Sequence, residues 1–497
     1  MKAFIIKKVL ALVILASSLI MLMVCQTFAQ SGSQDILSDV DEFVNSKMEE
    51  LRIKGAAIGI VQNNKIYTKG YGVSNTEESP VTPQTPFILG STTKSITALA
   101  VMQLVEAGKV NLDDSVQKYI PWFHVADEAS ANIKVCHLLN QTSGIPDTAG
   151  NYNYLDNKST QEDFVKKLSE QKLVSAPGGE YHYAEANYVI LGVLISNVSG
   201  QSYEDYIEKH VFTPLEMNNS FTAKDKAVKN GLSKGYRTCF GFPFEADIPY
   251  PKQYVAASYL ISSAEDMAHY LHMYMNGGRY NETSLLSSEG VGELFEPGPK
   301  LQHPEGYSYS MGWFVSEENK IHDGRPTNYY SCILLDSKNK VGIVLLTNTN
   351  NRLVTAEYSM PVAFGISDIV SGKRVQNSSF GFRQLYLLFN IIILVFIALL
   401  LLRLVLSLTI FRKKLQIQKG LRKAILSILP DVLVFLSALC ILIYLLVSMQ
   451  IAFSIAMLGQ PDIVISFILI MAVSLINLFV RLILILVSRN QRLYIKV

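Results

Sequence analysis

Three long apolar blocks near the C-terminal end constrain this chain more than any other feature of its sequence. The blocks cover residues 385–411, 432–453 and 463–487, and each has about the length that a helix needs to cross the hydrocarbon core of a bilayer. Helices are the expected form, because a lipid-exposed segment must satisfy its backbone hydrogen bonds internally. The sequence therefore predicts a membrane domain over residues 385–497 with three transmembrane helices.

The charged residues between the blocks predict their orientation. The connection FRKKLQIQKGLRK (residues 411–423) and the tail after residue 488 are rich in Lys and Arg, whereas MQIAFSIAMLGQPD (residues 449–462) has neither. Because basic loops stay on the cytoplasmic side, we expect the C-terminus in the cytoplasm. Arg403 and Arg481 interrupt the blocks near their cytoplasmic ends, and we expect them to reach the inner interface rather than mark a functional relay.

The N-terminal end has the pattern of a secretory signal peptide. Residues 1–29 combine a basic start, an apolar run and a small-residue exit at Ala29. An uncleaved anchor is the alternative, given the length of the apolar run. A signal peptide would deliver residues 30–370 to the outside, in agreement with the orientation of the C-terminal blocks, and residues 371–384 have the composition of a linker. The sequence thus predicts a multi-pass cell-membrane protein with its large domain extracytoplasmic.

The charge and cysteine content of the remaining chain argue against several classes of function. Residues 30–385 hold 30 of the 44 Lys and Arg and 40 of the 42 Asp and Glu, and this net charge of −10 would repel nucleic acid. Cys136, Cys239 and Cys332 lie outside the signal peptide and the apolar blocks. Their odd number and wide spacing indicate neither a disulfide framework nor a zinc site.

Metal and cofactor chemistry find no support in the sequence. His269 and His272 share a helical face with Asp266, but no HExxH motif or fourth ligand accompanies them, so we expect a surface trio. A phosphate-cradling glycine loop is also missing from the sequence. We therefore expect no metal and no cofactor.

The pair Ser91-x-x-Lys94 is the first candidate for catalytic chemistry. It follows Gly90 and opens an apolar helical run that Gly108 closes, whereas three further Ser-x-x-Lys matches lie in polar, charged or hairpin segments, at Ser115, Ser169 and Ser337. A serine at a helix N-terminus lies among free N–H groups that can hold an oxyanion. Lys94, one turn on, can take the hydroxyl proton if burial lowers its pKa. The alternative is that Ser91 caps the helix and Lys94 faces solvent.

The order of the predicted elements indicates a mixed domain. An amphipathic helix at 36–55 precedes two strands within 56–72, joined at Asn63-Asn64, and strands return from about 307 to 348 with a turn at 337–339. The sequence between is mostly helical or irregular. Two polar sites stand out: Tyr183 at a turn before an apolar helix, and His322-Asp323-Gly324 at a strand end, where Gly324 would let a substrate approach closely.

Four segments in this order resemble the class C β-lactamase and D-alanyl-D-alanine carboxypeptidase group of serine hydrolases, a group related to the penicillin-binding proteins. They are Ser91-x-x-Lys94, HLLNQTSGIP (137–146), Tyr183-x-Glu185 in PGGEYHYAEANYVILG, and His322-Asp323-Gly324. The resemblance implies an α+β fold, in which helices and a helical subdomain flank an antiparallel sheet, followed here by the three transmembrane helices. The site would lie between a sheet edge and the helical part.

The resemblance also implies a mechanism. Ser91 would be acylated, and Lys94 and Tyr183 would transfer protons, with the Lys94 cation helping to hold Tyr183 as or near a phenolate. The backbone N–H groups of Ser91 and Arg325 would form the oxyanion hole. His322 stands where many members have lysine, at a position that meets a substrate carboxylate or backbone. The alternative for Tyr183 is a packed aromatic at a helix entrance.

Glu185 departs from the family pattern, which has Asn two residues after the tyrosine. An ionised Glu only accepts hydrogen bonds, whereas Asn can donate to a substrate carbonyl. Glu185 would then pair with Lys94 or select a substrate that carries a hydrogen-bond donor. The alternative is that Glu185 faces outward as an ordinary surface residue. The change argues against β-lactam hydrolysis more than against acyl transfer.

Three functions stay open at this point. The outline of signal peptide, outward hydrolase and three spans is similar to the prodrug-activating membrane peptidases of nonribosomal peptide pathways, typified by the colibactin-maturing enzyme, and so favours a peptidase or amidohydrolase on D-amino-acyl substrates. A cell-wall D,D-peptidase, esterase or penicillin-binding enzyme is the second function, and a non-turnover sensor the third. The expected partners are a small peptide or N-acyl-D-aminoacyl substrate, the bilayer, and an exporter or second copy met through the transmembrane helices.

Overall fold

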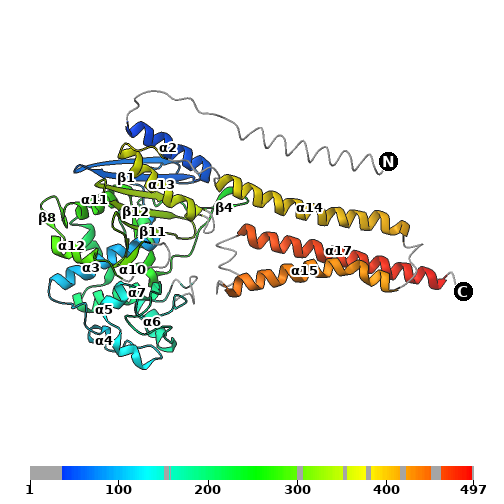
Figure 1. Ribbon diagram of the computed structural model, residues 1–497, viewed down its shortest axis with the longest axis horizontal. Coiled ribbons are helices and arrows are strands. Elements are labelled where there is room, and N and C mark those ends of the chain that lie inside the picture. The colour runs from blue at the N-terminus through cyan, green and yellow to red at the C-terminus, as the bar shows by residue number, and fades with distance from the viewer. Residues whose placement is uncertain are drawn as a thin grey trace.

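The computed structural model describes residues 36–149, 156, 158–298, 306–350, 355–375, 382–414, 421–448 and 461–494. The predicted signal peptide, and residues 376–381 of the predicted linker, lie outside these described residues. An α+β domain, ending in the described chain at residue 375, is followed by three long helices that extend away from it (Figure 1).

A seven-stranded antiparallel sheet forms the centre of the α+β domain, in the order β2-β1-β13-β12-β11-β10-β9. Its strands are β1 (Gly55–Gln62), β2 (Lys65–Gly72), β9 (Ser308–Ser310), β10 (Trp313–Val315), β11 (Asn319–Gly324), β12 (Tyr330–Asp336) and β13 (Val341–Thr347). The predicted N-terminal hairpin is confirmed, with φ of 51° at Asn63 and 62° at Asn64, as a two-residue hairpin turn requires. The β12–β13 hairpin confirms the second predicted turn.

Both faces of the sheet are covered, so its central strands are buried throughout. On one face α2 (Ile36–Leu51) packs with α13 (Thr355–Val370), and one apolar core fills the space between them and the sheet. On the other face α11 (Ala264–Met275) lies against β1 and β13, where a Cβ on Gly59 would come within 2.9 Å of the Ala264 carbonyl oxygen. The predicted helix at 36–55 therefore ends four residues early, because β1 begins at Gly55.

The helical part packs below the sheet around α3 (Thr93–Glu106) and α7 (Glu185–Ser199), which are apolar on almost every side. The other helices there are α4 (Val116–Tyr119), α5 (Val135–Leu139), α6 (Gln161–Lys167), α8 (Tyr203–Ile207), α9 (Lys224–Lys229), α10 (Val255–Ser258) and α12 (Ser288–Leu294), with the 3-10 turn η1 (Gly90–Thr92) before α3. Three two-stranded sheets complete the domain: β3 (Phe87–Ile88) with β6 (Ile261–Ser262), β4 (Tyr236–Cys239) with β5 (Phe242–Glu245), and β7 (Arg279–Tyr280) with β8 (Thr283–Ser284).

The expected surface trio on α11 is wrong for two of its members. Asp266 and His272 are buried. The Asp266 carboxylate accepts hydrogen bonds from the Asn219 N–H at 2.7 Å and the Ser220 hydroxyl at 2.7 Å, so it ties a loop to the start of α11. Within the described residues, no group of three or more His, Cys, Asp or Glu side chains has a metal-binding arrangement.

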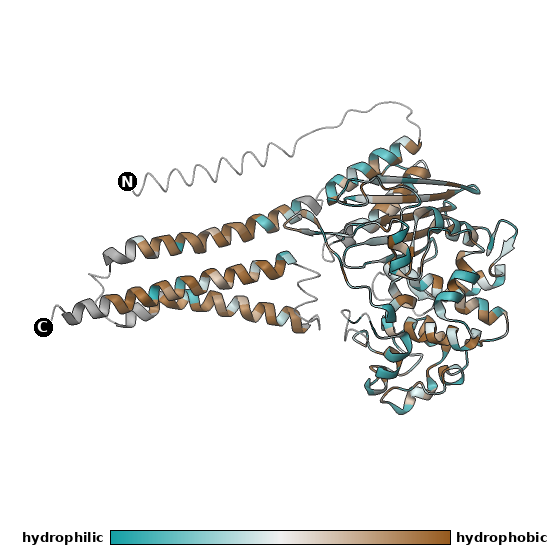
Figure 2. Ribbon diagram, turned by 180° about the vertical axis from the view of Figure 1, so that it is seen from behind, coloured by the Kyte–Doolittle hydropathy of each residue, from teal (hydrophilic) through white to brown (hydrophobic). Residues whose placement is uncertain are grey.

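The three apolar blocks form α14 (Phe382–Lys414), α15 (Leu421–Ser448) and α17 (Pro461–Tyr494). Segments long and apolar enough to cross a membrane run over Tyr386–Leu406, Ile428–Val447 and Pro461–Val487. Figure 2 shows the ribbons of these helices mainly in the brown of hydrophobic residues. The predicted second block is shifted, because α15 begins eleven residues earlier than 432 and continues through Pro430. The three helices suggest membrane anchoring, and their orientation stays a prediction.

Arg403 and Arg481 have a shared acidic partner that the sequence did not predict, and their reach to the inner interface stays a prediction. Both guanidinium groups pair with Asp431 of α15, Arg403 Nε at 3.0 Å and Arg481 Nε at 3.4 Å, and the Asp431 side chain is fully buried. One carboxylate therefore joins all three long helices, since Arg403 lies on α14 and Arg481 on α17.

Candidate active site

The backbone at the start of α3 places Ser91 at the end of a narrow turn. Gly90 has a positive φ of 59°, and a Cβ there would lie 2.5 Å from the Pro326 ring, so glycine fits for both reasons. Ser91 follows within η1, and the N-cap of α3 is Thr92. The capping alternative for Ser91 is therefore wrong.

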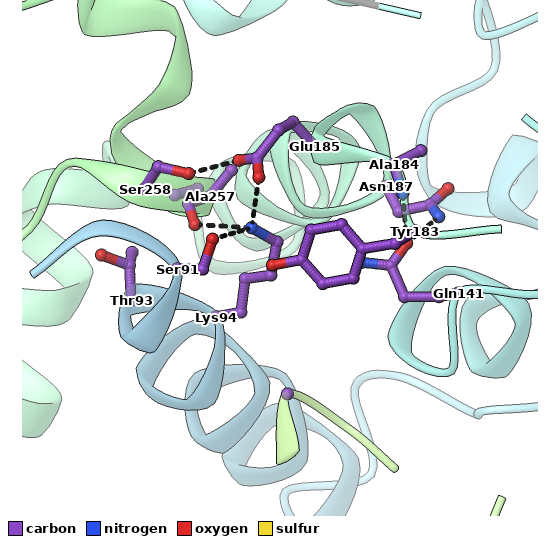
Figure 3. Close-up of polar contacts among 12 residues, drawn as sticks. Ser91, Thr93, Lys94, Gln141, Tyr183, Ala184, Glu185, Asn187, Ala257 and Ser258 are labelled. Atoms are coloured by element: carbon purple, nitrogen blue, oxygen red, sulfur yellow. Dashed lines mark hydrogen bonds and ion pairs between the residues drawn. The ribbon is translucent and has the colours of Figure 1, made fainter. Parts of the chain in front are cut away.

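Lys94 is fully buried and points back toward Ser91. Its Nζ donates to Ser91 Oγ at 3.2 Å, to Glu185 Oε1 at 2.8 Å and to the Ala257 carbonyl oxygen at 3.0 Å (Figure 3). Burial lowers the pKa of Lys94, and the adjacent Glu185 carboxylate opposes this shift. The solvent-facing alternative is thus wrong, and the amine is held in an environment that favours its neutral form more than water does.

Tyr183 lies beside both Lys94 and the nucleophile. Lys94 Nζ is 4.7 Å from the centre of its ring, and Figure 3 shows the phenolic oxygen turned toward Ser91 and Lys94. Burial and the charge of Glu185 raise the pKa of Tyr183 well above its ordinary value, and a hydrogen bond with Ser91 lowers it in part. These shifts oppose the expectation of a resting phenolate and favour a neutral hydroxyl.

The segment 137–146 supports the turn that carries Tyr183. Gln141 has a positive φ of 58°, and its side-chain oxygen accepts hydrogen bonds from the Ala184 N–H at 2.9 Å and the Asn187 side chain at 2.5 Å. The segment therefore fixes the entrance of α7 instead of reaching the nucleophile itself.

Glu185 is the first residue of α7 and turns inward. Besides pairing with Lys94, its second carboxylate oxygen accepts a short hydrogen bond from the Ser258 hydroxyl, and its side chain is only 18% exposed (Figure 3). The expected pairing with Lys94 is present, and the surface alternative is wrong. Ala257 and Ser258 of α10 were not predicted as site residues, because no motif marks a short helix that contributes one carbonyl and one hydroxyl.

His322 is a buried residue of β11, and its ring lies next to the Tyr183 side chain. Its Nδ1 is hydrogen-bonded to the Gly312 carbonyl oxygen, and its Nε2 lies 3.5 Å from the Tyr183 hydroxyl. Burial lowers the pKa of His322 to about 3, so the ring is neutral near pH 7. It therefore differs from the lysine that the resemblance implies for this position, since it offers a substrate carboxylate no positive charge.

Gly324 and Arg325 lie beside the backbone of the nucleophile. A Cβ on Gly324 would be 1.9 Å from the Leu89 carbonyl oxygen and 2.9 Å from the Ser91 nitrogen, so glycine is needed to make room for the backbone around Ser91. The close approach of a substrate to Gly324 stays a prediction. The Arg325 nitrogen would be 3.0 Å from a Cβ on Gly90. The amides of Ser91 and Arg325 thus lie close to each other, and the Arg325 guanidinium pairs with Asp323.

The strand beside Ser91 has an open edge. β10 pairs with β11 only at Phe314–Ile321 and Val315–Lys320, so in the described chain the segment His322–Gly324 is paired with β12 alone. The candidate site therefore lies between a sheet edge and the helical part.

The sequence matches the Beta-lactamase family over residues 40–360, well over half of the chain. The chain belongs to this family. The matched range leaves out the three long helices, so membership covers the α+β domain alone.

Relatives and solved structures agree with the family. The chain is 29% identical to Protein flp of Staphylococcus aureus (strain MW2) over 329 residues, which is 65% of each chain, and 28% identical to the putative penicillin-binding protein PbpX of Bacillus subtilis, over 66% of this chain and 78% of that one. The octameric penicillin-binding protein homologue from Pyrococcus abyssi is 30% identical, with a TM-score of 0.59 over 68% of this chain and 78% of that one. FmtA from Staphylococcus aureus, 23% identical with a TM-score of 0.56 over 71% and 94%, shows the same fold.

Proposed function

We propose that this protein is a membrane-anchored serine hydrolase that works through an acyl-enzyme on Ser91. The observation that carries the proposal is the 3.2 Å contact between the Ser91 hydroxyl and the fully buried amine of Lys94. Family membership supports a serine hydrolase of the β-lactamase and penicillin-binding type.

In the proposed reaction the neutral form of Lys94 accepts the Ser91 proton as the oxygen attacks the substrate carbonyl. The resulting ammonium is stabilised by Glu185, 2.8 Å away. The N–H groups of Ser91 and Arg325 bind the oxyanion. Tyr183, kept neutral by burial, gives its proton to the leaving group, and Lys94 then returns a proton to the phenolate. The same proton transfers then run in reverse with water in place of the leaving group. This releases the acyl group and restores the Ser91 hydroxyl.

The substrate that we propose is a peptide or amide of a D-amino acid. In the narrower form of this proposal, the enzyme removes an N-acyl-D-aminoacyl cap from an exported nonribosomal-peptide prodrug. An extracytoplasmic domain at residues 30–370, delivered by a signal peptide at 1–29 and held by helices whose C-terminal end is cytoplasmic, would meet such a substrate outside the cell. An exporter or a second copy of the chain is the partner proposed for the C-terminal helices.

A cell-wall penicillin-binding enzyme is the second candidate, favoured by the names of PbpX and the Pyrococcus homologue. Because Glu185 cannot donate a hydrogen bond while ionised, we expect penicillin to acylate Ser91 slowly. A fluorescent penicillin that labels the protein rapidly and completely would favour this candidate. An acyl adduct that never turns over on any substrate would favour a sensor.

Labelling by a fluorophosphonate probe tests the proposal in membranes that hold the full chain. Ser91→Ala should abolish labelling. Ser337→Ala is the matched control, because Ser337 also belongs to a Ser-x-x-Lys match but lies exposed in the β12–β13 turn, and it should label as the unaltered chain does. Equal labelling of Ser91→Ala would overturn the proposal. Mass spectrometry of a panel of N-acyl-D-aminoacyl amides would then identify the acyl and leaving groups.

A further inference from the structure

The β4–β5 hairpin presents two exposed phenylalanines on one face. In its register Arg237 pairs with Phe244 and Cys239 with Phe242, so these four side chains share one face of the two-stranded sheet. Phe242 is 72% exposed and Phe244 41%. Among the described residues before the three long helices, no other large hydrophobic side chain is as exposed as Phe242.

This face is turned toward the first residues of two of the long helices. Asp462, the second residue of α17, is close enough for its charge to act on both Arg237 and Cys239. Burial lowers the pKa of Arg237 to about 10, and Asp462 opposes this shift in part. Burial raises the pKa of Cys239, and the charge of Asp462 raises it further. In the hairpin turn, a Cβ on Gly241 would lie 3.3 Å from the ring of Tyr386, where the apolar segment of α14 begins. Figure 1 shows β4 beside the start of α14. The hairpin therefore lies level with the ends of two membrane-crossing segments.

The hairpin is fixed to the α+β domain by the backbone at the edge of β4 and by the Tyr236 side chain on its opposite face. Tyr236 is buried, its N–H donates to the Asn348 carbonyl oxygen at 2.6 Å, and its own carbonyl oxygen accepts from the Asn350 N–H at 3.2 Å. The two phenylalanines therefore do not reach the core of the domain in this arrangement. Their exposed apolar area would be removed from water by a second surface against the outer face of the hairpin.

We propose that the Phe242 and Phe244 face of the β4–β5 hairpin binds the surface of the same bilayer that α14 and α17 cross. The location of the hairpin identifies the bilayer as its binding partner, because a bilayer around the segments that begin at Tyr386 and Pro461 has its interface at the level of this hairpin. Aromatic side chains are favoured at that depth, and the polar ends of a hairpin remain solvated among the headgroups.

The hairpin also joins the bilayer surface to the candidate site. The Asn328 side chain donates to the Ala246 carbonyl oxygen at 2.7 Å, and the Tyr329 hydroxyl donates to the Ser233 carbonyl oxygen at 2.6 Å. Both residues follow Arg325 in the loop beside Ser91. A hairpin bound to the membrane would therefore hold this loop at a constant height above the bilayer.

Tryptophan quenching by brominated lipids tests the proposal with the full chain in liposomes. Phe242→Trp should lose about half of its added emission when the lipid chains carry bromine near the headgroup, as an interfacial aromatic does. Phe244→Trp should be quenched in the same way. Thr283→Trp is the control, because β8 lies on the side of the domain away from the long helices (Figure 1), and its added emission should be unchanged.

The emission of the native residues Trp122 and Trp313 is measured in the unaltered chain and subtracted. Added emission at both 242 and 244 that is quenched no more than at 283 would overturn the proposal. Both positions are exposed, so the substitutions are expected to leave folding intact, and circular dichroism checks this for each variant.

Discussion

Lys94 and Glu185 in the candidate active site can be compared with Arg403, Asp431 and Arg481 among the long helices. Both sets bury a carboxylate against cations that come from other helices. In the first, the cation also contacts a hydroxyl, Ser91 Oγ, and its pKa is lowered by burial. In the second, two guanidinium groups, which stay charged, share one carboxylate.

The difference separates a reactive cluster from a structural one. An amine whose pKa is lowered can gain and lose a proton during a reaction, and Lys94 lies next to a nucleophile that must lose one. Arginine cannot do this at ordinary pH, so its pairing with Asp431 fixes how three helices pack. We expect substitutions in the first cluster to change chemistry, and substitutions in the second to change assembly.

Lys94→Met should produce the largest effect. Removing the proton acceptor while keeping the volume of the side chain should slow fluorophosphonate labelling of Ser91 about 1000-fold. The rate of labelling in membranes measures this directly. Arg403→Met, which removes a cation from the second cluster, should leave that rate unchanged. A comparable loss in both variants would show that the two regions do not act separately.

Asp431→Asn should have the largest effect on the helices. It leaves two guanidinium groups without their shared carboxylate, and we expect a loss of about 3 kcal/mol in the stability of the three-helix packing. Thermal unfolding and protease sensitivity in detergent should report the loss, while Ser91 of the folded fraction labels at the normal rate. Asp431→Glu keeps the charge and should recover most of the stability.

The elements that sequence could predict are those decided by local pattern. Apolar length identified the three long helices, and the Asn63-Asn64 turn identified the first hairpin. The 3.2 Å contact of Lys94 with Ser91 follows from a three-residue separation at the start of a helix. The approach of Tyr183 was inferred from family resemblance, because nothing local connects residues 91 and 183.

Contacts between distant segments explain the failures. Arg403 lies 28 residues before Asp431 and on another helix, so its partner has no signature in the sequence around it. Asp266 was expected at the surface because no metal-binding motif accompanies it, but its carboxylate is buried and accepts a hydrogen bond from the N–H of the distant residue Asn219. Gly324 was correctly marked as special, and only the structure showed that the backbone of Leu89 and Ser91 requires the space.

Glu185→Gln should separate two effects of Glu185 on Lys94: it raises the pKa of the amine, and it stabilises the ammonium that forms in the reaction. Glu185 raises the pKa of Lys94, so its removal should lower that pKa further. If neutral Lys94 accepts the proton, the rising limb of the pH–rate profile should move to lower pH. The maximal rate should fall about tenfold, because the ammonium formed in the reaction loses its partner. Glu162→Gln, which breaks the exposed pair with Lys166, is the control and should change neither quantity.

His322→Gln should have the smallest effect, and it should depend on pH. The pKa of His322 is lowered from 6.5 to about 3 in the folded protein, so the unfolded chain binds a proton first as the pH falls. The stability that this neutral histidine contributes is therefore present above about pH 6.5 and is lost progressively toward pH 3, by about 1 kcal/mol at pH 5.5. Thermal unfolding of the full chain in detergent at pH 8 and pH 5.5 should show a smaller acid loss for His322→Gln than for the unaltered protein. Equal losses would mean that the imidazole is not held neutral beside Tyr183, and the arrangement of His322 next to the reactive cluster would then differ from the one described.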